Sequence, residues 1–347
     1  MIGDFFRKDL KNFKTYEVCK DNYKVRMDAN ESFFNFPKEL NEQMLKVIES
    51  FLFNRYPEGE ASEVCSLYAQ YAKVQSKNVM AGNGSDELIQ IVVNTFITAG
   101  DKVVTLSPDF SMYVIYTKIA GGIPVEIPLD EEFKLETEAL ISRVNKEEIK
   151  ILFLSNPNNP TGGIIPREDI TRIIEGCKCI VVIDEAYFEF YGKTIVDKID
   201  SYENLIVLRT CSKGMGLAAL RLGFLITNDI LMEELKKVKP PFNVNSITQS
   251  IASIILKNQV VIKENVECII KERDYLSENL RNMEGIKTYP SQGNFILIKV
   301  KNVAEIKEKL LAHSINIRSF KNTALKNCLR ITVGTRAEND SLLTCIL

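Results

Sequence analysis

The sequence predicts an α/β protein with two parts: a large domain in which a mostly parallel, seven-stranded sheet lies between helices, and a smaller α+β domain. Three observations carry this prediction. Between residues 38 and 238, helical patterns alternate with short apolar segments. Some of these segments are apolar throughout, such as Ile180-Val181-Val182-Ile183, which is typical of strands buried on both faces of a parallel sheet. At Lys239-Pro240-Pro241 the alternation stops and a different order of elements begins.

The first half of the chain predicts the layered domain. Residues 1–35 are polar and aromatic and hold one β-like stretch, Tyr23 to Met27. A helix is expected from Lys38 to Leu52, because apolar residues recur there every three to four positions. The strands expected after it are Asn78–Met80, Lys102–Leu106, Pro124–Pro128, Lys150–Leu154, Ile180–Ile183, Leu205–Leu208 and Leu222–Ile226. Helical patterns between them favour α/β layering.

The second half predicts a different arrangement. Two long helices are expected after the proline pair, over Ser246–Lys257 and Val260–Met283. The rest follows the order strand, strand, helix, strand, strand, helix, over Lys287–Tyr289, Asn294–Val300, Val303–Ala312, Asn316–Ser319, Cys328–Val333 and the tail. This order predicts a separate α+β domain, which the N-terminal segment is expected to join. The predicted large domain is therefore 38–238, and the predicted small domain combines 1–37 with 239–347.

Composition excludes several classes of function. Of 347 residues, 45% are hydrophobic and 26% charged, and a net charge of −2 with mixed signs offers no basic surface for nucleic acid or for a membrane. The N-terminus lacks the apolar core of a signal peptide, and no apolar run is long enough to cross a bilayer, so a cytoplasmic protein is expected. A single histidine, His313, excludes a two-histidine metal centre within one chain, and no metal is expected. The eight cysteines form no C-x-x-C motif and are expected to be reduced.

Four local patterns follow predicted strands, where open α/β sheets bind ligands. Gly82-Asn83-Gly84-Ser85-Asp86-Glu87 opens a helix, and its amides suit a phosphate, although a plain capped turn has the same composition. Ser155-Asn156-Pro157-Asn158-Asn159-Pro160-Thr161-Gly162 is either a rigid turn or a site that presents two asparagine amides. Asp184-Glu185-Ala186-Tyr187 ends the most apolar strand, so Asp184 is either a helix N-cap or a buried carboxylate that needs a partner.

The fourth pattern, Thr210-Cys211-Ser212-Lys213-Gly214-Met215-Gly216, precedes Arg221. A lone lysine is usually a solvated surface group, but the hydroxyls and glycines around this one suit an anion. Neither a nucleotide P-loop nor a dinucleotide fingerprint is present. Together the patterns match a ligand with a phosphate, an electron-poor ring that needs a carboxylate, and a carbonyl that condenses with a lysine. Pyridoxal phosphate has all three.

On these motifs the chain resembles the fold-type-I pyridoxal-phosphate aminotransferases and, among them, the histidinol-phosphate aminotransferase family. The resemblance runs from Asp28-Ala29-Asn30-Glu31 to the segment 329–335. It rests on an ordered set of motifs: Arg55-Tyr56-Pro57, Gly84-Ser85-Asp86, Asn158-Asn159-Pro160-Thr161-Gly162, Asp184-Glu185-Ala186-Tyr187, and Ser212-Lys213 to Arg221. It implies transamination between histidinol phosphate and 2-oxoglutarate in histidine synthesis, by a homodimer with a shared active site.

The resemblance also implies the roles of residues toward the cofactor. Lys213 would bind the cofactor aldehyde and then act as the base, and Asp184 would pair with the pyridine nitrogen. Asn159 and Tyr187 would hydrogen-bond the ring 3′-oxygen. The residues expected around the ring face and the phosphate are Phe110, Gly84, Ser85, Asp86, Thr210, Ser212, Arg221 and, from the neighbouring subunit, Tyr56.

Toward the substrate, the resemblance implies one anion site for two different groups. Glutamate brings a carboxylate and histidinol phosphate brings a phosphate, and the forked donors of Arg330 and Arg318 suit both. Asn30 and Tyr16 are expected to line the pocket. The chain departs from the family at Phe110, where tyrosine is common, and at Ala219, where glycine is usual, and an alanine there is expected to crowd the phosphate loop slightly.

Four alternatives remain open. A threonine-phosphate decarboxylase of cobalamin synthesis shares the fold and cofactor, but that family usually opens with a histidine- and glycine-rich segment that is absent here. An aminotransferase for aromatic amino acids is the second, and Arg318 argues against it. A non-catalytic cofactor-binding sensor, the third, would carry a DNA-binding module, and the intact Lys213, Asp184 and Tyr187 disfavour it. A plain nucleotide-binding protein lacks its glycine fingerprint.

Overall fold

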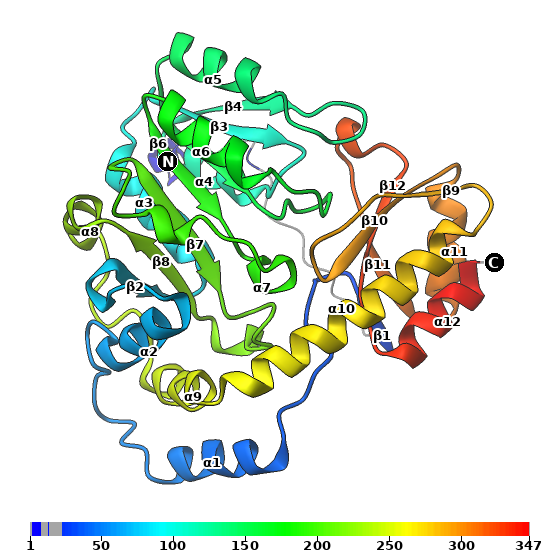
Figure 1. Ribbon diagram of the computed structural model, residues 1–347, viewed down its shortest axis with the longest axis horizontal. Helices are drawn as coiled ribbons and strands as arrows, with labels where there is room; N and C mark the ends of the chain where they lie inside the picture. The colour runs from blue at the N-terminus through cyan, green and yellow to red at the C-terminus, as the bar shows by residue number, and fades with distance from the viewer. Residues whose placement is uncertain (1, 8–12, 14–22, 347) are drawn as a thin grey trace.

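The strands of the protein form two separate sheets. The computed structural model describes residues 2–7, 13 and 23–346. The larger sheet has the strand order β2-β8-β7-β6-β5-β3-β4, and β8 runs antiparallel to both of its neighbours while the other pairs are parallel (Figure 1). Its strands are β2 (Val79–Gly82), β3 (Lys102–Ser107), β4 (Ile123–Pro128), β5 (Ile149–Ser155), β6 (Ile180–Asp184), β7 (Leu205–Thr210) and β8 (Gly223–Thr227). The predicted seven-stranded, mostly parallel sheet is confirmed.

Helices cover both faces of this sheet. They are α2 (Ser62–Ala72), α3 (Ser85–Phe96), α4 (Met112–Ile119), α5 (Thr137–Lys146), α6 (Arg167–Gly176), the short α7 (Phe188–Tyr191) and α8 (Asp229–Lys236). Along β6, Val181 and Ile183 pack in one buried cluster with α2, α5 and α6, whereas Val182 packs in another with α3, α4 and α8. This alternation explains the continuous apolar run, because both faces of the strand are covered.

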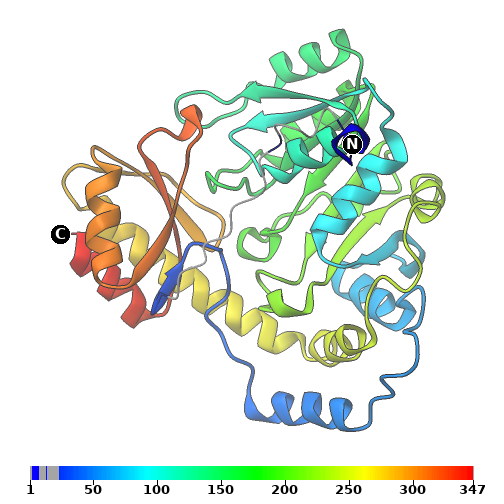
Figure 2. The ribbon, with the colours of Figure 1, turned by 180° about the vertical axis from the view of Figure 1, so that it is seen from behind.

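A second sheet of five strands lies beside the first, in the order β1-β11-β12-β10-β9. Its strands are β1 (Val25–Met27), β9 (Ile286–Thr288), β10 (Phe295–Val300), β11 (Ile315–Ser319) and β12 (Cys328–Thr332). The early strand β1 pairs in parallel with β11, so segments about 290 residues apart in the sequence lie side by side in one sheet (Figure 2). The helices α11 (Val303–Ala312) and α12 (Arg336–Ile346) and the C-terminal half of α10 (Gln259–Arg281) cover one of its faces.

The long helix α10 packs against both sheets (Figure 1). Each sheet with the helices that cover it is called a layer below, the larger and the smaller. Ile262 and Ile269, in its first half, share a buried cluster with the larger sheet, and Leu276 and Leu280 pack against the smaller one. The remaining helices are α1 (Lys38–Glu49) and α9 (Ser246–Lys257), and short 3₁₀ turns lie at Ile2–Phe5, Ser76–Asn78, Val196–Lys198, Ala218–Leu220 and Thr323–Leu325. Both α9 and the start of α10 follow residue 239 but pack against the larger sheet. The domain boundary at residue 239 stays a prediction.

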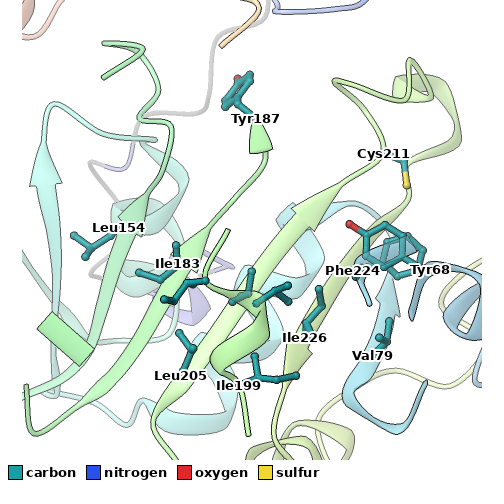
Figure 3. Packing of buried hydrophobic residues seen from close by; sticks show 14 of the residues in the cluster. Tyr68, Val79, Leu154, Ile183, Tyr187, Ile199, Leu205, Cys211, Phe224 and Ile226 are labelled. Carbon is teal, nitrogen blue, oxygen red and sulfur yellow. The ribbon is translucent and has the colours of Figure 1, made fainter. Parts of the chain in front are cut away.

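Aromatic stacking closes the core beside β8. The rings of Tyr68 in α2 and Phe224 in β8 are parallel, with centroids 3.7 Å apart, and Ile226 and Val79 extend the same cluster (Figure 3). Cys211 is buried at the edge of this cluster, and the cysteines of the described residues are free thiols. In the described ranges, no helix is long and apolar enough to span a membrane.

Candidate active site

Three neighbouring parallel strands end in polar residues on the wall of one cavity. Ser155 ends β5, Asp184 ends β6 and Thr210 ends β7, and parallel strands bring their carboxyl ends to the same edge. The cavity has a volume of about 470 Å³, within the range of small-molecule sites. Predicted site residues that line it are Asn30, Ser85, Asp86, Phe110, Asn159, Asp184, Tyr187, Thr210, Ser212, Lys213, Arg221, Arg318 and Arg330.

Lys213 lies in this cavity with its amine held by main-chain oxygens. Its Nζ donates to the carbonyl oxygens of Ala29 and Asn30, at 3.0 and 3.1 Å. Burial, assisted by the positive charge of Arg330, lowers the pKa of Lys213 to about 8. Within the described part of the chain no carboxylate forms an ion pair with this lysine. About a tenth of the amine is therefore uncharged at pH 7, far more than for a lysine of ordinary pKa, and the uncharged amine is the form that attacks a carbonyl.

Asp184 is a buried carboxyl that receives two hydrogen bonds from the protein. The hydroxyl of Tyr113 in α4 donates to Oδ2 at 2.7 Å, and the amide of Ala186 donates to Oδ1 at 3.0 Å. Burial outweighs both and raises the pKa of Asp184 to about 6. A ligand cation beside it would favour the ionised form, so this position suits a protonated pyridine nitrogen.

A second buried carboxyl lies behind the first. Asp109 accepts a short hydrogen bond from the Ser155 hydroxyl and one of 2.8 Å from the amide of Phe110. Burial, assisted by the negative charge of Asp184, raises the pKa of Asp109 to about 7. Asp109 does not line the cavity, but its hydrogen-bond partner Ser155 does.

An anion cup lies at the start of α3. Gly84 precedes the helix with φ +83°, a conformation that favours glycine, and β8 passes so close that a Cβ on Gly223 would lie 2.6 Å from the amide nitrogen of Ser85. Arg221 donates to Asp86 at 3.1 Å and so holds its guanidinium over this turn, near the hydroxyl of Ser212. A helix N-terminus, hydroxyls and an arginine together suit a phosphate.

Tyr187 and Asn30 connect the two layers at the cavity wall. The side chain of Asn30 donates to the Tyr187 hydroxyl at 2.9 Å, and its main-chain amide donates to Thr332 in β12. Asn159, from the proline-rich turn, accepts from Arg330 at 2.5 Å. The second terminal nitrogen of Arg330 donates to the carbonyl of Asp28 at 2.6 Å. The guanidinium of Arg330 is thus fixed between both layers.

Two predicted residues, Gly84 and Tyr56, do not line this cavity. Gly84 lies beneath the anion cup, where a Cβ would be 2.8 Å from a terminal nitrogen of Arg221. Tyr56 is 83% exposed and stacks on Phe242 with ring centroids 4.9 Å apart. Tyr16 lies outside the described residues. Ala219 does line the cavity, and its φ is not positive, so an alanine there needs no strained backbone.

Other residues of the site were not identified from the sequence. Tyr113 and Asp109 contact the wall residues Asp184 and Ser155 without lining the cavity, and Arg26 lines it. Phe110 lies two residues before α4 and Tyr113 in its first turn, so no helical spacing in the sequence linked Tyr113 to the site. For Arg26 the signal was its place in the β-like stretch, because alternate residues of a strand point to opposite faces.

These groups fit pyridoxal phosphate: the lysine suits its aldehyde, the buried carboxyl its ring nitrogen, and the anion cup its phosphate. All of them lie at the carboxyl ends of strands or in the loops that follow. These features define the class: a fold-type-I enzyme that depends on pyridoxal phosphate. Comparison with known proteins narrows this class. The family model described as aminotransferase class I and II matches residues 23–346, and the chain belongs to this family.

Named relatives match over nearly the whole chain. A histidinol-phosphate aminotransferase of Clostridium novyi is 50% identical over 346 residues, which cover 100% of this chain and 97% of the relative. One from Clostridium kluyveri is 48% identical and covers 99% of this chain and 98% of its own length. The crystal structure of histidinol-phosphate aminotransferase from Sinorhizobium meliloti in complex with pyridoxal 5′-phosphate has a TM-score of 0.87 and 25% identity, and the match covers 93% of this chain and 90% of that one.

Proposed function

We propose that this protein transfers the amino group between histidinol phosphate and 2-oxoglutarate, with glutamate as the second amino acid, in histidine biosynthesis. The observation that carries the proposal is one cavity in which Lys213 and Asp184 face an arginine-lined wall that holds Arg330 and Arg318. The relatives named histidinol-phosphate aminotransferase support the choice of substrate.

The arginine wall explains how two unlike substrates share one site. Arg318 in β11 lies opposite Arg330 in β12, so the two side chains lie on the same face of the smaller sheet. Glutamate offers a planar carboxylate and histidinol phosphate a tetrahedral phosphate, and each accepts paired N–H donors. One wall therefore serves both halves of the reaction, with the reacting carbon toward Lys213.

The proposed role of Lys213 is to move a proton at the reacting carbon. Pyridoxal phosphate, when bound, supplies an aldehyde that exchanges amino groups and a ring that accepts electron density from the substrate. Lys213 Nζ would take the proton from the substrate Cα and would deliver it to the cofactor carbon that carried the aldehyde. A pKa of about 8 suits both directions, because the amine loses and regains a proton near neutral pH.

The remaining residues orient and polarise the site. Ionised Asp184 would hold a proton on the ring nitrogen, and the hydroxyl of Tyr113 supports that ionised form. The Tyr187 hydroxyl and the Asn159 side chain would donate to the ring 3′-oxygen. Phe110 would cover the ring face, and the phosphate would lie in the anion cup between Ser212 and the first turn of α3. Asn30 and, outside the described residues, Tyr16 would border the substrate.

The proposal includes a homodimer and a cytoplasmic location. Tyr56 belongs to an exposed apolar surface together with Leu52, Phe53 and Phe242, at 83%, 68%, 71% and 45% exposure. Such a surface is typical of a protein interface, and Tyr56 of one subunit would reach the cofactor phosphate of the other. Free thiols at the described cysteines fit a reducing compartment.

The visible spectrum of the purified protein tests the proposal. The cofactor band is expected to bleach when histidinol phosphate is added without a keto acid, and to return on addition of 2-oxoglutarate. Lys213→Ala is the negative control, since it removes the covalent attachment and is expected to abolish both changes while the melting temperature stays near that of the wild type. If the cofactor band does not change with histidinol phosphate but does change with threonine phosphate or an aromatic amino acid, the proposed substrate is wrong and that compound takes its place.

A further inference from the structure

A third arginine lies on the same wall as the two that the sequence identified. Arg26 in β1 is in register with Asn316 in β11, and Arg318 lies two residues further along β11. Residues in register on adjacent strands, and residues two apart on one strand, point to the same face. Arg26, Arg318 and Arg330 therefore share one face of the smaller sheet, and all three line the cavity.

The opposite face of the same strands is buried, which fixes this orientation. Met27, the next residue along β1, packs in the core of the smaller sheet with Ile317 and Leu329. A one-residue slip of β1 would bring Arg26 into that core and expose Met27. The side chain of Arg26 is accordingly held toward the cavity by the packing of its neighbour.

The guanidinium of Arg26 is held more loosely than that of Arg330. Its nearest carboxylate oxygens are 3.9 Å away on Asp28 and 3.8 Å away on Glu31, and half of the side chain is exposed. In the described part of the chain Arg26 donates no hydrogen bond. Both terminal nitrogens of Arg330, by contrast, bind oxygens at 2.5 and 2.6 Å. Arg26 is thus a half-exposed cation in the cavity lining, and its guanidinium can move onto an anion without breaking a hydrogen bond.

The two substrates differ in the charge they bring to this wall. A phosphate monoester carries a charge of about −1.5 to −2 at pH 7 and three acceptor oxygens, whereas a carboxylate carries one negative charge and two oxygens. Two arginine forks satisfy a carboxylate, but a phosphate leaves one oxygen for a third donor. We propose that Arg26 is a specificity-determining residue that contacts the phosphate of the phosphorylated amino alcohol. The inference rests on the proposed function and adds the residue that favours phosphate over carboxylate.

Steady-state kinetics of Arg26→Gln test this inference. The ratio of kcat/KM for histidinol phosphate to kcat/KM for glutamate is expected to fall about tenfold, the effect of one charge-assisted hydrogen bond at a half-exposed position. Arg26→Lys is expected to restore part of the ratio, because a lysine keeps the charge but lacks the fork. For histidinol, which has no phosphate, kcat/KM is expected to fall in Arg26→Gln no more than it does for glutamate.

Lys24→Gln is the matched control, since it removes one positive charge from the same segment but outside the cavity lining. The control is expected to keep the wild-type ratio. An equal fall for both substrates in Arg26→Gln, an unchanged ratio, or a fall of the same size in Lys24→Gln would overturn the inference. If Arg26→Gln does not fold, Arg26→Lys serves as the test: a smaller fall of the same ratio supports the inference, and an unchanged ratio overturns it.

A separate measurement distinguishes this inference from the proposed function. Inorganic phosphate is expected to inhibit the reaction of glutamate by competing for the arginine wall, and to do so about tenfold less well in Arg26→Gln. If the wild type does not use histidinol phosphate, the proposed function fails, but phosphate inhibition still tests Arg26. Equal inhibition of both proteins would contradict a phosphate contact at this residue.

Discussion

Replacing Tyr113 by phenylalanine removes one hydrogen bond from the carboxyl of Asp184 and leaves the rest of the wall in place. The two side chains are buried, 0% and 3% exposed, and their oxygens are 2.7 Å apart. A hydrogen bond to a buried charged group contributes about 1.5–3 kcal/mol, and one pKa unit corresponds to about 1.36 kcal/mol. Loss of the hydroxyl therefore makes the ionised carboxyl harder to form, by the equivalent of about 1–2 pH units.

Equilibrium binding of pyridoxal phosphate to cofactor-free protein, from pH 5 to 9, measures this effect. The ionised form of Asp184 holds the ring nitrogen, so affinity is expected to fall as the pH drops through its pKa, which is about 6 in the wild type. In Tyr113→Phe this fall is expected at a pH higher by about 1–2 units. Tyr116→Phe, in the same helix but outside the cavity lining, is the control and also accounts for titration of the cofactor itself. Identical pH profiles for Tyr113→Phe and the wild type would refute the role of this hydroxyl.

Two further substitutions test the charged groups of the site. At saturating cofactor, Asp184→Asn is expected to lower kcat about a hundredfold or more, since a preorganised charge of this kind contributes on the order of 3 kcal/mol; near-native kcat would mean that Asp184 does not pair with the ring. Arg330→Ala is expected to raise KM for glutamate and for histidinol phosphate alike, by roughly 10- to 100-fold, and a loss confined to one substrate would contradict a shared anion site.

The central part of the fold was predictable because local pattern and burial agree there. In β6 the run of apolar residues is explained by cover on both faces, and the polar residue that ends it reaches the cavity. The antiparallel direction of β8 was not predictable, because it depends on how the chain returns from the Lys213 loop and not on the composition of the strand. The helix expected to reach Leu52 ends at Glu49, although the apolar spacing continues through Phe51, since those last side chains do not pack in the core.

The same distinction applies to the site. Lys213 and Asp184 stand in motifs whose residue types state their chemistry, so the sequence identifies them. Tyr113 has no such motif: its importance comes from a contact with a residue 71 positions later. Arg26 is similar, because β1 has three residues and becomes part of the arginine wall only through its pairing with a strand at the other end of the chain. Contacts that depend on tertiary pairing leave no local pattern to interpret.

The pairing of β1 with β11 has a consequence for biosynthesis. The partner of Val25 is Ile315, which a ribosome adds about 290 residues later, or roughly 15 to 60 s at 5–20 residues per second. Until then Ala29 and Asn30, whose carbonyls receive the amine of Lys213, have no strand to anchor them. Prematurely terminated chains that contain every cofactor motif through Arg221 therefore lack a complete cavity, and the cell obtains an active site only from chains that also contain β11 and β12.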